Sequence, residues 1–251
     1  MSPRSYSSSS LDQLMATGVV VLAGGAGRRM GGNVRKQYLT LAGEPVLKWA
    51  LRPFLEHPGI DTLVLVLPRS DLEEPPAWIS SFGLTTVAGG AERGESVWNG
   101  LSALPGSIDT VLIHDGARPL VDREVIDRVL AWAGTGAAVA GVRVSDTIKV
   151  ADSAGVVTKT LDRSGLWRAQ TPQGFPLPVI REVYRRARAQ GVSATDDSAL
   201  CEHFGIDVQM VDGSPDNLKI TRPVDLMVAE SIVKRMRGQG EGGMTGCRRR
   251  V

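Results

Sequence analysis

The sequence predicts an α/β protein whose core is a Rossmann-like, mostly parallel twisted sheet with helices on both faces. Short apolar runs, typical of strands buried on both sides, recur along the chain. Segments with helix boundary signals lie between these runs. The two patterns alternate up to about residue 142, which is the order that builds a parallel sheet from strand–helix–strand units.

The elements of this alternating part can be placed from their boundary residues. Pro45 stands near the first position of one predicted helix, where a missing backbone N–H is tolerated. Asp122 is a good N-cap for another, because its carboxylate can accept a hydrogen bond from the first helical turn. We expect strands at 18–23, 61–67, 84–87, 110–113 and 137–142, and helices at 45–56, 91–103 and 122–132.

The alternation breaks after residue 142. Two β-rich runs, 147–150 and 156–161, flank a turn at 152–155 and predict a hairpin. A hairpin that protrudes exposes strand edges, which pairing with another subunit would cover. We therefore interpret the segment at about 143–166 as a protruding dimerisation arm; an arm that folds back on its own domain is the alternative. Beyond it, helices and strands are expected at 178–189, 196–203 and 206–211, with a final helix at 223–235.

Composition bounds the class of protein. The 251 residues carry a net charge of +2, too small to suggest a nucleic-acid surface, and no apolar run approaches a membrane span. Cys201 and Cys247 stand alone, which fits a reducing, cytoplasmic setting without disulfides or a zinc site. The serine-rich start is not a secretory signal. We expect one domain at 17–237, between disordered tails at 1–16 and 238–251.

The turn after the first predicted strand indicates a phosphate-binding loop. Leu22–Met30 carries three glycines and two arginines, and Arg35–Gln37 follows shortly after. Glycines let backbone N–H groups approach a polyphosphate, and basic side chains supply the charge that it needs. The dinucleotide fingerprint lacks its third glycine, and the P-loop pattern fails because Asn33 replaces its lysine. The remaining pattern resembles the sugar-nucleotide and cytidylyl transferases; an ordinary turn with surface arginines is the alternative.

Three further loops follow predicted strands, and ligands of open α/β sheets bind beyond the carboxyl ends of strands. The glycines and serine of 89–96 can contact the edge of a base. Asp115 in the next loop is a natural Mg²⁺ ligand, and the loop 212–223 brings another acid and Lys219. Taken singly, Asp115 could equally cap the following helix, and Lys219 could be a solvated surface lysine. Together the loops predict a nucleotide site.

A series of short motifs extends over most of the chain. They are Ala23–Met30, Lys36–Leu39, Glu92–Val97, His114–Pro119, Asp146–Lys149, Asp162–Trp167, Thr171–Gln173, Thr195–Asp197 and Asp216–Pro223. In this order, over roughly residues 18–236, they resemble the 2-C-methyl-D-erythritol 4-phosphate cytidylyltransferase family of the non-mevalonate isoprenoid pathway. The resemblance implies a nucleotide-diphospho-sugar transferase-like fold and an enzyme that joins CTP to methylerythritol phosphate (MEP) with release of pyrophosphate.

The resemblance also implies the roles of individual residues. Arg29 and Lys36 would contact the CTP phosphates, and Lys219 would stabilise the pentavalent α-phosphate. Mg²⁺, or another divalent cation, would bridge the phosphates near Asp115, with Asp216 as a second ligand. The nucleotide pocket would comprise Ala23, Gly24, Gly25, Gly27, Gly90, Ala91, Ser96 and Asp115. The acceptor pocket would comprise Thr147, Arg163, Thr171, Thr195 and Asp196.

The resemblance also implies an assembly of two chains, and the sequence departs from the family pattern at two positions. In the family the arm reaches across a homodimer, so Arg163 would hold the phosphate bound by the other subunit. Gly116 stands where relatives often have alanine, and Ala91 where some have an acid, so a side-chain contact at residue 91 is in doubt.

The implied chemistry needs no general base. A phosphate monoester has a second pKa of about 6, so it is already mostly dianionic near neutral pH. We therefore expect His57 and His203 to be structural, and we assign His114 no proton transfer. The protein's task is to position two anions and to stabilise the charge of the transition state.

Three alternative functions remain at this point. A ribitol 5-phosphate cytidylyltransferase would share the CTP half of the site. A molybdopterin nucleotidyltransferase that uses GTP is disfavoured by the Asp162–Trp167 segment and by the arm. A non-catalytic nucleotide-binding module could have the same fold, but it would need neither Lys219 nor an acceptor pocket.

Overall fold

The computed structural model describes residues 15–24 and 35–242, and the side chains of these up to residue 238. Its main sheet has seven strands: β1 (Thr17–Leu22), β4 (Thr62–Leu67), β5 (Thr85–Ala88), β6 (Thr110–Asp115), β7 (Ala137–Arg143), β10 (Trp167–Pro176) and β11 (Val208–Asp212). They lie in the order β11-β7-β10-β6-β1-β4-β5. β1 pairs in parallel with β4 and β6, β4 with β5, and β7 with β11. The predicted mostly parallel sheet is confirmed.

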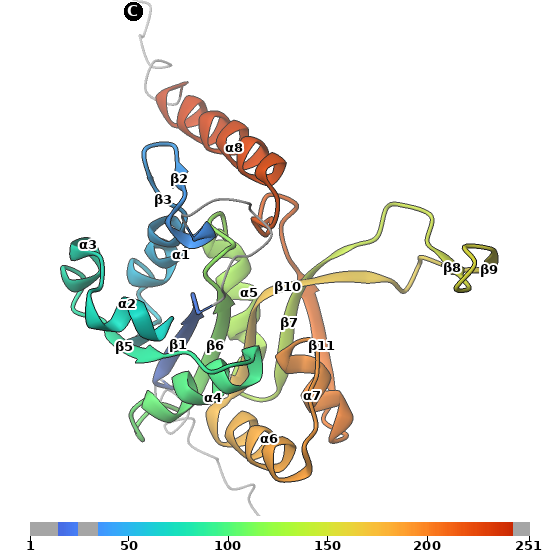
Figure 1. Cartoon of the computed structure of the whole chain (residues 1–251), viewed down its shortest axis with the longest axis horizontal. Coiled ribbons are helices and arrows are strands. Elements are labelled where there is room, and N and C mark those ends of the chain that lie inside the picture. Colours follow the sequence, from blue (N-terminus) through green and yellow to red (C-terminus); the bar gives the residue numbers. More distant parts are fainter. Residues whose placement is uncertain (1–14, 25–34, 243–251) are drawn as a thin grey trace, which may run out of the picture.

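One strand of this sheet was not predicted. β10 lies between β6 and β7 and runs antiparallel to both (Figure 1). Its buried part includes Gln170, Thr171 and Gln173, and Pro172 interrupts it, so it has no apolar run. The ladder to β7 shifts register between residues 169 and 173. A strand that buries polar side chains in a network lacks the pattern by which sequence reasoning recognises strands.

Helices cover both faces of the sheet, as predicted. On one face Val19 and Val21 of β1 pack with α1 (Val46–Leu55) and α5 (Arg123–Ala133). On the other face Val20 packs with α4 (Arg93–Ala103), α6 (Leu177–Gln190) and α7 (Asp197–His203). The Asp122 carboxylate accepts a hydrogen bond from the backbone N–H of Val125 at 2.7 Å, which confirms it as the N-cap of α5. The site is thus built on a sheet whose two faces are both covered by helices.

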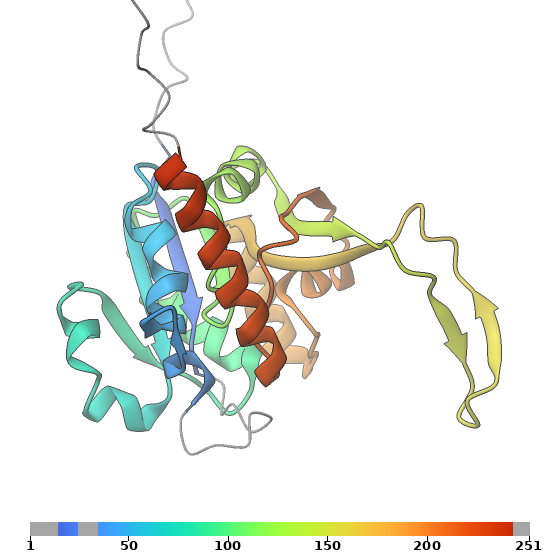
Figure 2. The ribbon, with the colours of Figure 1, turned by 90° about the horizontal axis from the view of Figure 1, so that it is seen from above.

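Short elements surround the sheet, and a long helix packs against β2 and α1. The short elements are the 3₁₀ turn η2 (Lys36–Tyr38), the strands β2 (Thr40–Leu41) and β3 (Glu44–Pro45), and the helices α2 (Arg69–Glu73) and α3 (Ala77–Ser80). The long helix α8 (Pro223–Gly242) packs Ala229, Ile232 and Val233 against Leu41 and Val46 (Figure 2). It continues beyond the predicted end at residue 235, so the tail predicted from residue 238 begins inside a helix. Glycines suggested an earlier end, but a helix tolerates single glycines at about 1 kcal/mol each.

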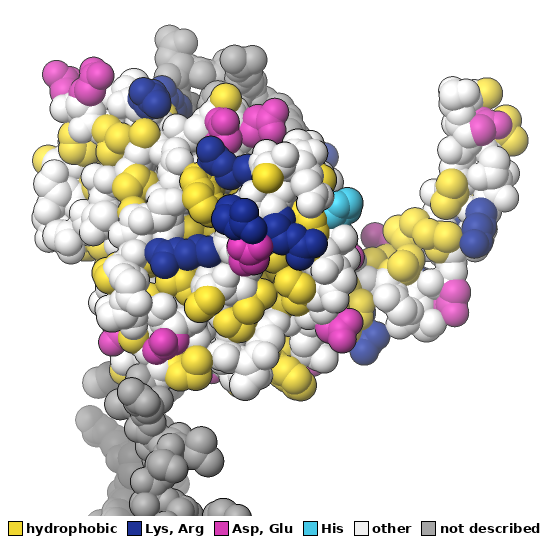
Figure 3. All heavy atoms as spheres, turned by 90° about the horizontal axis from the view of Figure 1, so that it is seen from below, with side chains coloured by type: hydrophobic (Ala, Val, Ile, Leu, Met, Phe, Trp, Pro, Cys, Tyr) yellow, Lys and Arg dark blue, Asp and Glu magenta, His cyan; other side chains and the backbone are white. Residues whose placement is uncertain are grey.

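The predicted hairpin is confirmed and stands away from the core. β8 (Lys149–Ala151) pairs antiparallel with β9 (Val157–Thr160), and both strands are exposed. Figures 1 to 3 all show the arm projecting away from the body of the molecule, so the alternative in which it folds back on its own domain is wrong. Val156 and Val157 are 61% and 55% exposed. None of the described helices is both long and apolar enough to cross a membrane.

Candidate active site

The four predicted loops meet around one cavity of about 500 Å³ at the carboxyl edge of β1 and β6. Parallel strands end at the same edge, so side chains just after them converge although they are distant in sequence. The cavity brings together residues predicted for the nucleotide and the reacting phosphate. They include Ala23, Gly24, Lys36, Gly90, Ala91, Ser96, Asp115 and Lys219.

The first loop is anchored at both described ends. The backbone N–H of Ala23 donates to the carbonyl of Val66 at 2.8 Å, and the buried side chain of Gln37 donates to the carbonyl of Ala23 at 2.9 Å. Gln37 thereby ties η2, which carries Lys36, to the end of β1. The predicted residues Gly25, Gly27 and Arg29 lie outside the described residues.

The second loop, residues 89–96, carries Gly89, Gly90 and Ala91 next to the start of α4, and we call these three residues the strap. The Ser96 hydroxyl accepts a hydrogen bond from the N–H of Gly90 at 3.1 Å and donates to the Glu92 carbonyl at 3.1 Å. The Glu95 carboxylate accepts one from the N–H of Ala91 at 2.7 Å. A Cβ at Gly90 would lie 2.2 Å from that of Glu95, so only glycine fits there. Ser96, predicted to contact the base, here holds the strap that lines the pocket.

Asp115 is the last residue of β6 and the electrostatic centre of the pocket. Its Oδ2 lies 2.7 Å from Nζ of Lys219, while Nε of Arg93 lies 3.9 Å from Oδ1 and Nε of Arg118 3.9 Å from Oδ2. Burial alone would raise the pKa of Asp115, but Lys219, Arg93 and Arg118 hold it well below its usual range. The carboxylate is therefore ionised near neutral pH.

These contacts exclude two alternatives considered from the sequence. Asp122, and not Asp115, caps the helix that follows, because the backbone N–H of Val125 donates to it. Lys219 is not simply a solvated surface lysine, since its amine is paired with Asp115 inside the pocket. The sequence also placed His114 and Asp115 in a turn, whereas both belong to the buried end of β6.

His114 lies beneath the pocket and is fully buried. Burial lowers its pKa to about 4, so the imidazole is neutral near neutral pH. Its Nε2 lies 3.1 Å from the Arg118 carbonyl, which can only accept, so Nε2 carries the proton. Nδ1 then accepts from the Thr171 hydroxyl at 3.0 Å, and that hydroxyl accepts from the N–H of Asp115 at 3.0 Å. Both nitrogens are engaged, which supports assigning His114 no proton transfer.

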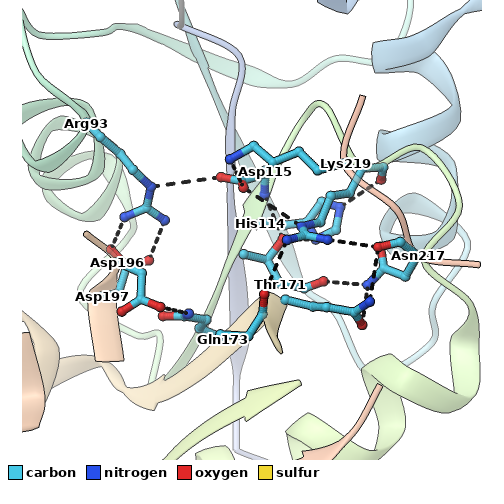
Figure 4. A network of polar contacts seen from close by, with 12 residues as sticks. Arg93, His114, Asp115, Thr171, Gln173, Asp196, Asp197, Asn217 and Lys219 are labelled. Carbon is cyan, nitrogen blue, oxygen red and sulfur yellow. Dashed lines mark hydrogen bonds and ion pairs between the residues drawn. The ribbon is translucent and has the colours of Figure 1, made fainter. Parts of the chain in front are cut away.

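The loop that carries Lys219 is fastened to β6 and β10 (Figure 4). The Asn217 amide donates to the Thr171 carbonyl at 2.8 Å, and Arg118 donates to the Asn217 carbonyl at 2.8 Å. The N–H of Ile220 donates to the carbonyl of Ala117 at 2.7 Å. Lys219 thus extends from a fixed backbone, although its own side chain is 39% exposed.

The residues predicted for the acceptor do not line this pocket. Thr147 and Arg163 lie on the exposed arm, where Arg163 donates to the Ser145 carbonyl. Thr171 is buried below Asp115. Thr195 and Asp196 line a separate hollow of about 600 Å³ beside α7. Asp196 is the N-cap of α7, where its Oδ1 accepts from the N–H of Ala199 at 2.9 Å.

An ion pair next to the pocket, between the buried Asp197 and the partly exposed Arg93, was given no role in the prediction from the sequence. Arg93 donates to both oxygens of Asp197 at 2.8 and 2.7 Å, and Asp197 also accepts from Tyr184 at 2.5 Å. Both residues stand inside motifs that the family resemblance highlighted. Their pairing spans 104 positions, and no periodicity in the sequence signals it.

The pocket fits a divalent cation that arrives with a nucleotide. Mg²⁺ is commonly held by one or two carboxylates together with substrate phosphates and water. Asp115 is an ionised carboxylate in the cavity, whereas Asp216 does not line it and pairs with Arg235 on α8. Among the described residues, no cluster of three or more His, Cys, Asp and Glu could hold a metal by itself.

A glycine strap, a buried carboxylate and lysines at the carboxyl edge of a mostly parallel sheet form the kind of pocket that a nucleotidyltransferase needs. The family model of IspD, 2-C-methyl-D-erythritol 4-phosphate cytidylyltransferase, matches residues 17–235. The chain belongs to this family and is a cytidylyltransferase. The family resemblance, the fold class and the enzyme class expected from the motifs are thereby confirmed.

Curated relatives match over most of the chain. The 2-C-methyl-D-erythritol 4-phosphate cytidylyltransferase of Syntrophus aciditrophicus is 42% identical over 228 residues, which are 88% of this chain and 97% of the relative. That of Syntrophotalea carbinolica is 44% identical over 228 residues, 87% and 97% of the two chains. The bifunctional enzyme IspD/IspF of Desulfotalea psychrophila is 42% identical over 220 residues. The match spans 86% of this chain but only 56% of that enzyme's length.

Solved structures show the same fold. The 4-diphosphocytidyl-2C-methyl-D-erythritol synthase of Anaerococcus prevotii has a TM-score of 0.78 at 28% identity, covering 88% of this chain and 97% of its own. The 2-C-methyl-D-erythritol 4-phosphate cytidylyltransferase of Thermus thermophilus has a TM-score of 0.73 at 33% identity, covering 86% and 98%.

Proposed function

We propose that this pocket transfers the cytidylyl group of CTP to MEP, giving 4-diphosphocytidyl-2-C-methyl-D-erythritol and pyrophosphate. The observation that carries the proposal is the pairing of Asp115 with Lys219 at 2.7 Å in a cavity that all four predicted loops line. Membership of the cytidylyltransferase family supports the choice of nucleotide and acceptor. A ribitol 5-phosphate acceptor is not favoured by the family or the relatives.

The reaction is a single in-line displacement. An oxygen of the MEP phosphate attacks the α-phosphorus of CTP, and the bond from that phosphorus to the bridging oxygen of pyrophosphate breaks. The attacking phosphate is already largely dianionic near neutral pH, so no proton needs to be removed. This agrees with a neutral His114 whose two nitrogens are both occupied. Catalysis then rests on positioning and on cations that neutralise the crowded α-phosphate.

The side chains divide between the nucleotide phosphates and the transferred group. We assign Lys36 and Arg29 to the phosphates of CTP, and we carry over from the sequence the assignment of Gly25 and Gly27 to the same phosphates. We assign Lys219 to the transferred phosphate, where its charge is needed as the pentavalent state forms. Lys36 and Lys219 both line the cavity, which supports these roles.

We assign the base of CTP to the part of the cavity lined by the strap and the end of β1. Ala23, Gly24, Gly90 and Ala91, which have no side chain or only a methyl group, line the cavity. A virtual Cβ on Gly24 already lies 3.6 Å from Gly89 Cα and 3.6 Å from the Ser96 hydroxyl. The end of β1 and the strap are thus in direct contact beside the cavity, which supports assigning them together to the base.

The proposed divalent cation would bind between Asp115 and the phosphates of CTP. When bound, it would neutralise phosphate charge and orient the α-phosphate for attack. Asp115 presents an ionised carboxylate for this purpose, held by its basic neighbours. Asp216 remains only a sequence-based prediction as a second ligand, and its ion pair with Arg235 does not support it.

The acceptor site is proposed to need a second copy of the chain. Thr147 and Arg163 lie on an arm that projects away from its own sheet (Figures 1 and 2). In a homodimer joined through the arms, Arg163 would bind the MEP phosphate at the partner's pocket, with Thr171, Thr195 and Asp196 completing the acceptor site. Covering the exposed Val156 and Val157 would favour such pairing. We propose that this dimer works in the cytoplasm.

Pyrophosphate release tests the proposal. Purified chain is given CTP and Mg²⁺ with either MEP or ribitol 5-phosphate. Rapid release with MEP alone is the expected result. Release with ribitol 5-phosphate alone would overturn the acceptor, and release with neither, despite measurable CTP binding, would overturn the enzymatic function. Sedimentation at the assay concentration tests the dimer, and an active monomer would refute the shared acceptor site.

A further inference from the structure

The Arg93–Asp197 ion pair lies at the pocket, but the proposed reaction gives it no task. Arg93 is the first residue of α4 and lines the cavity with Asp115 and Lys219. Figure 4 shows its guanidinium between Asp115 on one side and the buried Asp197 on the other. Asp197 is fully buried in α7, so its negative charge depends on Arg93 for compensation.

The two bonds from the Arg93 guanidinium to Asp197 fix the direction of its third nitrogen, Nε. Both terminal nitrogens of Arg93 bind Asp197, and Tyr184 on α6 holds the same carboxylate at 2.5 Å. Because a guanidinium is planar, this clamp leaves Nε facing Oδ1 of Asp115, 3.9 Å away. A lysine in the same place has one point charge, so it cannot grip Asp197 with two bonds and face Asp115 as well.

The other cations near Asp115 approach a different oxygen. Lys219 and Arg118 lie 2.7 and 3.9 Å from Oδ2, whereas Arg93 faces Oδ1. In the proposed reaction the Lys219 amine must turn toward the transferred phosphate. Asp115 then loses its shortest ion pair, and the two arginines remain to hold its two oxygens.

We propose that Arg93, clamped by Asp197, is a positioning residue that holds Asp115 in its orientation for the nucleotide while Lys219 serves the transferred phosphate. This inference rests on the proposed function, since it concerns the same pocket. Arg93 acts through Asp115 and not on the substrates directly. Its loss therefore weakens the use of CTP and leaves the affinity for the acceptor unchanged.

Arg93→Lys tests this positioning role. We expect kcat/KM for CTP to fall about 10- to 100-fold, the usual effect of removing a residue that orients a ligand-binding group. The KM for MEP should stay at its wild-type value. Binding of CTP with Mg²⁺, measured by calorimetry without acceptor, should weaken in parallel. If Arg93 had a purely structural role, the substitution would lower thermal stability and would not affect the use of CTP more than that of MEP.

Arg185→Lys is the matched control. On the exposed side of α6, Arg185 also grips a carboxylate with two bonds, to Glu182 at 2.7 Å each. Neither Arg185 nor Glu182 lines the cavity, so the same substitution should leave both kinetic constants unchanged.

A second variant guards against misfolding. Arg93→Gln combined with Asp197→Asn removes both charges together, so no unpaired charge is left buried. Circular dichroism and thermal unfolding establish that it is folded, and its CTP use should fall as in Arg93→Lys. Wild-type CTP affinity and kcat/KM in either folded variant would overturn the inference. Absence of turnover by the wild type would instead refute the proposed function, while the binding comparison still tests Arg93.

Discussion

Gly90→Ala should damage the use of the nucleotide far more than the stability of the fold. A Cβ on Gly90 would lie 2.2 Å from Cβ and 2.6 Å from Oε2 of Glu95. Ordinary carbon–carbon contact needs about 3.5 Å, so the strap or the start of α4 must move by more than ~1 Å. Glu95 cannot simply swing away, because the clash involves its Cβ and its carboxylate also holds the N–H of Ala91.

The size of the effect follows from this displacement. A misplacement of about 1 Å in a positioned site costs on the order of 100-fold in rate, or about 2.7 kcal/mol. The strap is largely exposed, so the free energy of unfolding should change little. Steady-state kinetics with CTP as the varied substrate gives kcat/KM, and urea denaturation gives the stability.

Gly106→Ala is the matched control for this substitution. Gly106 lies in the loop after α4, and no atom lies within 4 Å of the Cβ that alanine would add there. It should therefore leave kcat/KM for CTP unchanged. If folded Gly90→Ala uses CTP as well as Gly106→Ala does, the strap does not position the nucleotide and the reasoning is refuted.

Three further predictions concern charge and titration. Lys219→Met should lower kcat for pyrophosphate release about 100- to 1000-fold, as expected when a transition-state charge donor is lost; a loss below tenfold would contradict its role. Cys201 is buried and its thiol pKa is raised to about 12, so in a Cys247→Ser variant a thiol reagent at pH 8 should react only after unfolding. Because burial lowers the His114 pKa from 6.5 to about 4, the unfolded chain binds the proton more readily. Stability should thus be lost as pH falls from about 6.5 to 4, by up to about 3 kcal/mol in protein without nucleotide or cation, and His114→Gln should flatten that slope.

The elements that the sequence predicted well are those whose signal is local. The apolar runs of β1 and β4 and the N-cap Asp122 can each be recognised within a few residues, and the structure confirms them. β10 was missed because Gln170 and Gln173 are stabilised by partners distant in sequence, such as the carbonyl of Ser214 and Asp196. A polar strand becomes understandable only when those partners are in place.

The site divides in the same way. Asp115 and Lys219 were recognisable because Asp115 ends β6 and Lys219 follows β11, and the carboxyl ends of these strands share one edge of the sheet. The Arg93–Asp197 pair was not, since nothing near either residue indicates the other. The arm could be predicted as a hairpin, but its length and composition do not determine the surface it covers, so its role in a dimer stays a prediction.

The arrangement of charge in the pocket accounts for how a site for two anions can remain stable without them. Cations placed together would repel one another and disfavour the folded state. Here Asp115 lies among Lys219, Arg93 and Arg118, and Asp197 neutralises Arg93 from below. When a nucleotide enters, Lys219 can exchange the Asp115 carboxylate for a phosphate, replacing one ion pair with another. Asp115 and Asp197 thus hold the cations in the positions where the reaction needs them, even before the substrates bind.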